Sequence, residues 1–135
     1  MVDYFSDYLR YRGISNIVLL DFLEDQTVLQ AKASLVVGRG SFTTMAELAA
    51  LGTPSLQILN DHNPVDTFHA RNFEMLGTAR LAKQSELSPA TLASTLEEML
   101  NWAILHRVQV AEAGKPYRNL NAAEQLAKIV GELLH

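Results

Sequence analysis

The sequence predicts an α/β fold that forms half of a doubly wound sheet, with about four parallel strands and helices on both faces. Short apolar runs without polar alternation occur at 16–22, 34–38, 54–59 and 78–82, as is typical of parallel strands buried on both faces. Segments with helical periodicity separate these runs, and Gly52 and Gly77 mark two helix ends. Right-handed crossovers then place the strands in one open sheet.

Composition and charge exclude several classes of function. At 135 residues the chain is expected to form a single domain over residues 1–135. The net charge of −4, with no basic run, predicts no nucleic-acid partner. Cysteine is absent, which excludes thiol catalysis, disulfides and thiolate metal sites and is consistent with a reducing cytoplasm. No apolar run approaches the roughly 20 residues that cross a bilayer, so we expect a cytoplasmic domain without a transmembrane segment.

The N-terminal third is expected to be helix, strand and short helix. Residues 3–12 read as a helix that Gly13 ends, with a broad aromatic and apolar face. An aromatic stripe at helical spacing favours a core face over a base-stacking surface. That stripe comprises Tyr4, Phe5, Tyr8, Leu9 and Tyr11. Residues 16–22 follow as a buried strand, and residues 26–33 as a short helix.

Residues 34–59, SLVVGRGSFTTMAELAALGTPSLQIL, form the unit around which the chain is organised. The apolar strand 34–38 is broken by a glycine turn at residues 38–41, because glycine tolerates backbone angles that other residues avoid. From Thr43 the period becomes helical, and Gly52 stands where a helix C′ glycine belongs. Pro54 cannot continue that helix, so residues 54–59 form the next strand.

The remainder is expected to be mainly scaffold. A helix at about 65–76 ends at Gly77, and Ser88-Pro89 opens another as N-cap and N1 proline. Residues 101–113 continue as a second helical stretch with Trp102, Leu105 and Val108 inward. Asn121 begins the last helix, with Glu124 as capping-box partner. Its expected core stripe is Leu126, Ile129, Val130 and Leu133.

The start of the helix after the glycine turn is the chemically suggestive position. First-turn N–H groups lack intrahelical partners and the helix dipole is positive there, which favours an anion, above all a phosphate. Ser41, Thr43 and Thr44 add hydroxyls, and Gly40 lets the backbone approach a ligand closely. Glu47 lies one turn beyond Thr44 on the same face and could accept two ribose hydroxyls. The alternative is a Gly/Ser turn with capping residues and a solvated acid.

The loop at 60–64 faces the same crevice, since ligands of open parallel sheets bind outside the carboxyl ends of the strands. His62 is either a donor to phosphate or sugar, or an exposed loop histidine. Arg39 either offsets diphosphate charge or pairs with Asp61 or Glu47. His62 and His69 with two nearby aspartates match no standard zinc spacing, so no metal site is expected.

Residues 36–56, with NPVDTFHARNFEMLG at 63–77, resemble the C-terminal nucleotide-sugar-binding domain of GT-B glycosyltransferases, a Rossmann-like half, and specifically family 28. The matching pattern is a glycine turn, Thr, Glu, Gly-x-Pro and a second strand. It falls on Gly40, Ser41, Thr44, Glu47, Gly52 and Pro54. The resemblance implies that residues 40–44 hold the diphosphate of a UDP-sugar and that Glu47 holds its ribose. It implies no cofactor and no metal.

The second motif departs from the family at two positions. Asp66 falls where many relatives carry a glutamine that contacts ribose or diphosphate, and His69 falls on their asparagine. A carboxylate near a diphosphate repels it unless it is aimed at the ribose. The nucleotide-sugar-binding residues expected from motif and resemblance are Arg39, Gly40, Ser41, Phe42, Thr43, Thr44, Glu47, His62, Asn63 and Asp66.

The resemblance implies a part of a transferase that moves a hexose, with N-acetylglucosamine expected, from UDP to an acceptor. Two alternatives are a non-catalytic nucleotide-binding subunit of a split glycosyltransferase and a fragment of a UDP-N-acetylglucosamine 2-epimerase-like enzyme. Against the family pattern the domain is expected to be incomplete, lacking about two upstream strands and the acceptor-binding half, which is expected on the same or a separate chain. No residue qualifies as a general base, so none is named catalytic and the chain alone is expected to be inactive. The open sheet edge beside 16–22 predicts a homodimer.

Overall fold

The structure, a computed structural model, describes residues 2–118 and 121–135 and centres on a parallel three-stranded sheet. The strands are β1 (Val36–Gly38), β2 (Ser55–Leu59) and β3 (Ala79–Lys83), in the order β1-β2-β3. Gly38 of β1 and Leu81 of β3 are both in register with Gln57 of β2. The predicted α/β class and parallel sheet are therefore confirmed, and the strands at 34–38, 54–59 and 78–82 are present.

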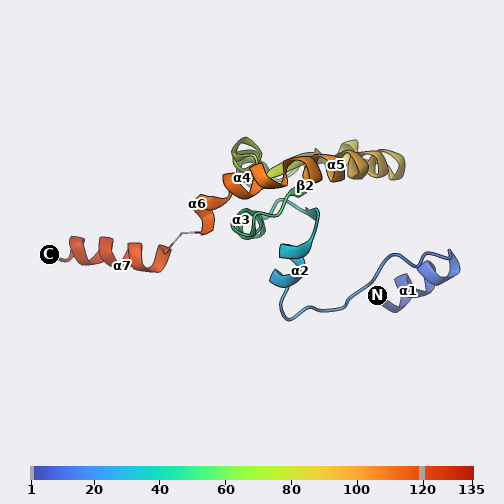
Figure 1. Cartoon of the computed structure of the whole chain (residues 1–135), viewed down its shortest axis with the longest axis horizontal. Coiled ribbons are helices and arrows are strands. Elements are labelled where there is room, and N and C mark those ends of the chain that lie inside the picture. The colour runs from blue at the N-terminus through green and yellow to red at the C-terminus, as the bar shows by residue number, and fades with distance from the viewer. Residues whose placement is uncertain (1, 119–120) are drawn as a thin grey trace.

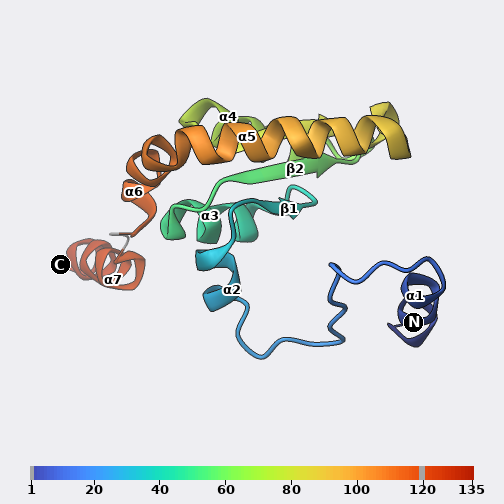
Figure 2. The same cartoon turned by 45° about the vertical axis from the view of Figure 1, so that its right-hand side comes forward.

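The prediction of a fourth strand, at 16–22, is wrong. These residues form no strand, and Val18 and Phe22 are each 80% exposed. In Figure 2 the segment runs as an extended loop away from the sheet, toward α1 (Val2–Tyr11). A strand needs a neighbour to pair its N–H and C=O groups, and the described residues supply none. Within the described residues the open edges of the sheet are consequently β1 and β3, and the edge expected beside residues 16–22 is formed by β1.

The core lies between the sheet and the helices α3 (Phe42–Leu51) and α4 (Pro64–Leu76). Both helices end in a left-handed glycine, Gly52 with φ +69° and Gly77 with φ +93°, as the sequence predicts. The buried apolar cluster joins both helices to β2 and β3. It consists of Met45, Ala49, Leu59, Ala70, Phe73 and Ala79.

Helix α5 (Pro89–Ala113) covers the opposite face of the strands from α3 (Figure 2). It is one continuous helix, so the two predicted stretches merge, and Ser88 caps it by accepting the Thr91 N–H. Ala103 and Val110 are buried, whereas Leu105 and Val108 are each 73% exposed, so their predicted inward placement is wrong. The helical period was correct, but the buried face is the one that carries Ala103 and Val110, on the opposite side of the helix from Leu105 and Val108.

Two arginine side chains connect neighbouring helices by hydrogen bonds, α5 to α2 (Thr27–Lys32) and α6 (Lys115–Arg118) to α3. Arg107 of α5 donates to the carbonyls of Ala31 and Ala33 at the end of α2, at 3.2 and 2.8 Å. Arg118 of α6 donates to the carbonyl of Ala50 at 2.7 Å. Carbonyls at a helix end lack intrahelical donors, so these guanidinium groups cap α2 and α3.

The apolar faces of α1 and α7 (Ala122–Leu133) are exposed, so both predicted core stripes are wrong. Tyr11 of α1 and Leu133 of α7 are 88% and 81% exposed. Periodicity identifies an apolar face but not what covers it, and α7 extends away from the sheet (Figure 1). The predicted capping box of α7 is also absent: Glu124 accepts from the Asn121 side chain instead of the N-cap backbone.

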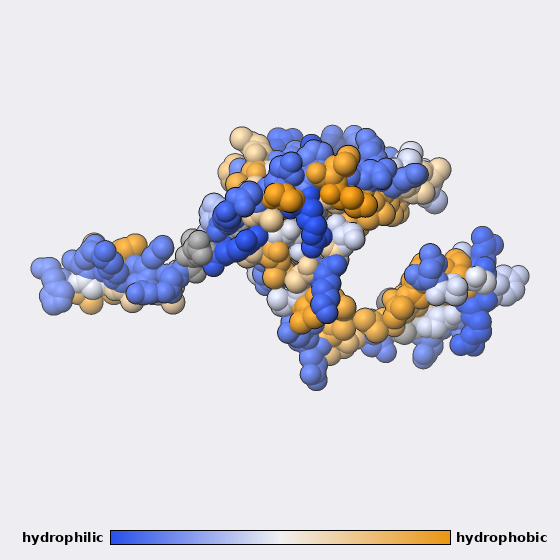
Figure 3. All heavy atoms as spheres, viewed as in Figure 1, coloured by the Kyte–Doolittle hydropathy of each residue, from blue (hydrophilic) through white to orange (hydrophobic). Residues whose placement is uncertain are grey.

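Apolar side chains also gather along residues 14–22, which link α1 to the rest of the chain (Figure 3). A short 3₁₀ helix, η1 (Gln84–Glu86), follows β3. Across the described residues, no helix combines the length and apolarity that a membrane span requires.

Candidate functional site

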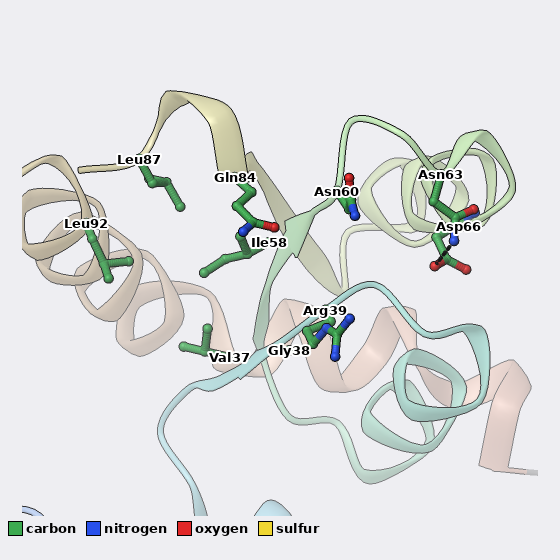
Figure 4. Close-up of a pocket in the computed structure, with 10 residues that line it drawn as sticks. All are labelled: Val37, Gly38, Arg39, Ile58, Asn60, Asn63, Asp66, Gln84, Leu87 and Leu92. Atoms are coloured by element: carbon green, nitrogen blue, oxygen red, sulfur yellow. Dashed lines mark hydrogen bonds between the residues drawn. The ribbon is translucent and has the colours of Figure 1, made fainter. Parts of the chain in front are cut away.

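A cavity of about 560 Å³ lies at the carboxyl edge of the sheet (Figure 4). Gly38 and Arg39 reach it from the end of β1, Asn60 from the end of β2 and Gln84 from the end of β3. Because all three strands are parallel, their carboxyl ends meet at one edge, where open α/β sheets bind ligands. The cavity is large enough for a small-molecule ligand.

The glycine turn leads from this cavity into α3. Gly40 is buried with φ +85°, a left-handed conformation that favours glycine, as the sequence predicts for the turn. Ser41 is the N-cap residue, with extended backbone, yet its side chain makes no capping hydrogen bond. Within the described residues the first-turn N–H groups of α3 are thus left without a side-chain cap, and the exposed hydroxyls of Ser41 and Thr43 lie beside them. This arrangement suits an anion.

Glu47 and Thr44 lie on α3 one helical turn apart, with Glu47 exposed and Thr44 partly buried. Neither residue lines the 560 Å³ cavity, and nor do Gly40, Ser41 or Thr43. The predicted site therefore separates into a helix start and an adjoining cavity, joined by Gly38 and Arg39 at the turn.

Phe42 contributes to packing between helices. Its ring lies edge-on to His69, with centroids 5.1 Å apart, and to Phe73, with centroids 5.7 Å apart. Aromatic pairs in this range are mutually stabilising. Phe42 and His69 thus hold the start of α3 against α4, and His69, the second departure from the family motif, has a structural partner.

Asn63 and Asp66 begin α4 and line the cavity together with Arg39. The Asn63 side chain accepts the Asp66 N–H at 3.2 Å and donates to the Asp66 carboxylate at 2.6 Å. Asp66 is therefore fixed at the helix N-terminus, where its negative charge is favourable. Within the described residues Arg39 forms no ion pair with Asp61 or Glu47, so its exposed guanidinium group is available to the cavity.

His62 is exposed and lines a second cavity of about 410 Å³, together with Asn60 and Gln84, which also line the first. The two cavities are thus neighbours. Among the residues that the structure describes, no three histidine or acidic side chains form a metal-binding group.

Three polar residues that line the 560 Å³ cavity or contact the glycine turn were not among those predicted. Asn60 and Gln84 follow the carboxyl ends of β2 and β3, so the edge rule that selected the loop at 60–64 could have found both. Gln57 lies in the middle of β2, fully buried, and accepts the Gly40 N–H. Its signal is a polar residue inside the apolar run SLQIL.

The comparisons with known proteins agree with this geometry. Residues 3–128 match the glycosyltransferase family 28 C-terminal domain. The chain belongs to this family. The recognition of family 28 from the glycine turn and the HARNFEMLG segment is therefore confirmed.

Curated relatives carry the name UDP-N-acetylglucosamine–N-acetylmuramyl-(pentapeptide) pyrophosphoryl-undecaprenol N-acetylglucosamine transferase. The one from Oenococcus oeni is 31% identical over 126 residues, which cover 90% of this chain and 33% of that protein. The one from Lactococcus lactis subsp. lactis is 29% identical over 136 residues, covering 97% and 37%. The one from Methylorubrum extorquens is 33% identical over 123 residues, covering 89% and 33%. This family 28 chain thus spans about a third of the length of these relatives.

Proposed function

We propose that this chain is the UDP-sugar-binding part of a family 28 glycosyltransferase that transfers N-acetylglucosamine from UDP to an acceptor. The family match over residues 3–128 carries the proposal, because the matched region includes the glycine turn, the helix start and the cavity at the carboxyl edge. The names of the curated relatives support N-acetylglucosamine as the sugar.

In this proposal the diphosphate binds at residues 40–44. The uncapped N–H groups of α3 and the nearby hydroxyls donate to it, and they stabilise the negative charge that develops on UDP as the sugar leaves. Arg39 offsets part of the remaining charge. Glu47, exposed one turn along α3, accepts the ribose hydroxyls. A leaving group stabilised in this way needs no metal.

The cavity next to the turn would receive the part of the donor that extends past the diphosphate. Its polar lining offers amide groups from Asn60, Asn63 and Gln84, which can both donate to and accept from sugar hydroxyls. Asp66 is the one carboxylate among these lining residues and is the least favourable neighbour for a diphosphate.

The proposed partner is an acceptor-binding half, on the same or a separate chain. A complete transferase and the nucleotide-binding subunit of a split transferase would use the same nucleotide site. One titration with a nucleotide therefore tests the feature that both alternatives require. The family match favours a transferase over the epimerase alternative. A cytoplasmic location stays a prediction from the sequence.

Calorimetric titration of the chain with UDP and with ADP tests the proposal. We expect UDP to bind more tightly than ADP, and Glu47→Ala to weaken UDP binding about tenfold, the loss expected for hydrogen bonds to a charged group. Glu97→Ala is the matched control, since Glu97 is an exposed acid on α5, away from the turn. No UDP binding at millimolar ligand, or equal losses in the two variants, would refute the proposed site.

A further inference from the structure

Gln57 is an unusual residue for the middle of a buried sheet. It is 0% exposed, lies on the central strand β2 and has strands on both sides. Its Nε2 atom is buried and has no hydrogen-bond partner in the described part of the chain. An unpaired buried donor is costly, and an apolar side chain of the same length would avoid that cost. Packing alone therefore does not explain why an amide side chain occupies this position.

The other end of the same amide supplies that reason. Gln57 Oε1 accepts the N–H of Gly40 at 2.9 Å, in a buried hydrogen bond across 17 positions of sequence. Gly40 offers a donor, so only the carbonyl oxygen of the amide can face it. This contact fixes the side-chain orientation and leaves Nε2 as the unpaired end.

The same side chain also explains the first glycine of the turn. A Cβ on Gly38 would lie 2.6 Å from Gln57 Oε1 and 3.3 Å from Nε2, so the amide occupies the space that a side chain at position 38 would need. Two positions on, a Cβ on Gly40 would lie 2.6 Å from Leu59 Cδ2. Alternate side chains of β2 thus lie directly under the two glycines of the turn.

We propose that Gln57 is a positioning residue that fixes the glycine turn and so presents the start of α3 to the diphosphate of the nucleotide. This inference rests on the proposed function. Gln57 itself is fully buried and does not touch the ligand. It acts by holding the Gly40 N–H inward, which sets the path of residues 38–41 into the uncapped first turn of α3.

The test replaces Gln57 by methionine, which keeps the length and burial of the side chain and removes the acceptor. In Gln57→Met we expect the Gly40 amide to lose its hydrogen bond, with a changed amide proton shift and about tenfold faster hydrogen exchange. The UDP dissociation constant should rise about tenfold while that of uridine changes less than about twofold, because uridine lacks the diphosphate.

Thr53→Val is the matched control. Thr53 is also 0% exposed and donates a partly buried hydrogen bond, to the carbonyl of Gln30 at 3.0 Å, away from the turn. This variant should lose stability while the Gly40 amide and the UDP-to-uridine ratio stay as in the unmodified chain. A merely structural role for Gln57 would make the two variants behave alike.

The outcomes separate the two proposals. An unchanged Gly40 amide in Gln57→Met overturns the positioning role, and so does a changed amide with an unchanged UDP-to-uridine ratio. If the unmodified chain binds neither UDP nor uridine, the proposed function is overturned and the role of Gln57 in binding with it. The Gly40 amide measurement then still decides whether Gln57 holds the turn.

Discussion

Asp66 is the residue whose charge most opposes the proposed ligand. Its carboxylate lines the cavity at the carboxyl edge of the sheet and is held there by Asn63 at 2.6 Å. We expect Asp66→Asn to tighten UDP binding up to about fivefold, the effect of removing about 1 kcal/mol of partly screened repulsion. It should also lower the free energy of unfolding by about 0.5–1 kcal/mol, because a negative charge leaves the N-terminus of α4. Calorimetry and thermal unfolding measure the two effects.

Asp25→Asn is the control for that substitution. Asp25 lies just before α2, whose N-cap is Gln26, and accepts the Thr27 N–H at 2.8 Å, but it does not line the cavity. It should reproduce the stability loss and leave UDP affinity unchanged. Weaker UDP binding in Asp66→Asn would instead mean that the carboxylate binds the ribose.

At the residue scale, sequence reasoning located side chains through motifs and strand ends. Gly40 has the positive φ that the glycine turn required, and Arg39, Asn63 and Asp66 share one cavity. Gln57 was missed because hydrophobic pattern reports only that a strand is buried. Its role depends on a contact with Gly40, 17 positions away, and the sequence does not show which distant residues meet.

The junction of α5 and α6 carries a second close contact, this time with α3. A Cβ on Gly114 would lie 1.9 Å from the carbonyl oxygen of Ala49. Gly114 has φ −79°, which any residue adopts, so space alone decides the effect of a substitution. We expect Gly114→Ala to lower the free energy of unfolding by about 3 kcal/mol, since the obstacle is backbone in a packed core.

Gly131→Ala is the matched control for Gly114→Ala. Gly131 lies within α7, and a Cβ there would meet nothing within 4 Å. Alanine in a helix interior is favoured over glycine by about 0.5–1 kcal/mol, so this variant should be neutral or more stable. Chemical denaturation of both variants checks the pair, and equal midpoints would contradict the packing of α3 against Gly114.

At the element scale, local sequence signals predicted where helices end, but they did not predict which elements pack against one another. Gly52, Gly77 and Ser88 lie at the helix boundaries that their chemistry predicts. Residues 16–22 have the composition of a buried strand but no strand beside them, so they stay exposed. A strand is stabilised by its neighbours, which no pattern within the segment can report.

The molecule as a whole exposes more apolar surface than one sheet and its helices can cover. Val18, Phe22 and Leu133 are at least 80% exposed, on segments that lie away from the sheet. Large exposed apolar surfaces mark sites of protein association. The open edge at β1 adds unpaired backbone groups to this surface, so association of the chain is expected at more than one place.

Pairing through the edge of β1 is one association that the topology allows, because β1, like β3 at the other edge, has a neighbour on one side only within the described residues. We expect the chain to be a homodimer in light scattering at tens of micromolar, with Val37→Lys shifting it toward monomer, since a lysine on an edge strand opposes pairing. Val37 is 46% exposed in the middle of β1. Val65→Lys, at a 62% exposed position on α4, adds the same charge away from the edge and should leave the dimer intact.

A chain that is monomeric at every concentration would contradict the expected dimer. If Val37→Lys stays as dimeric as Val65→Lys, the association instead uses the edge of β3, the apolar segment at 14–22 or α7.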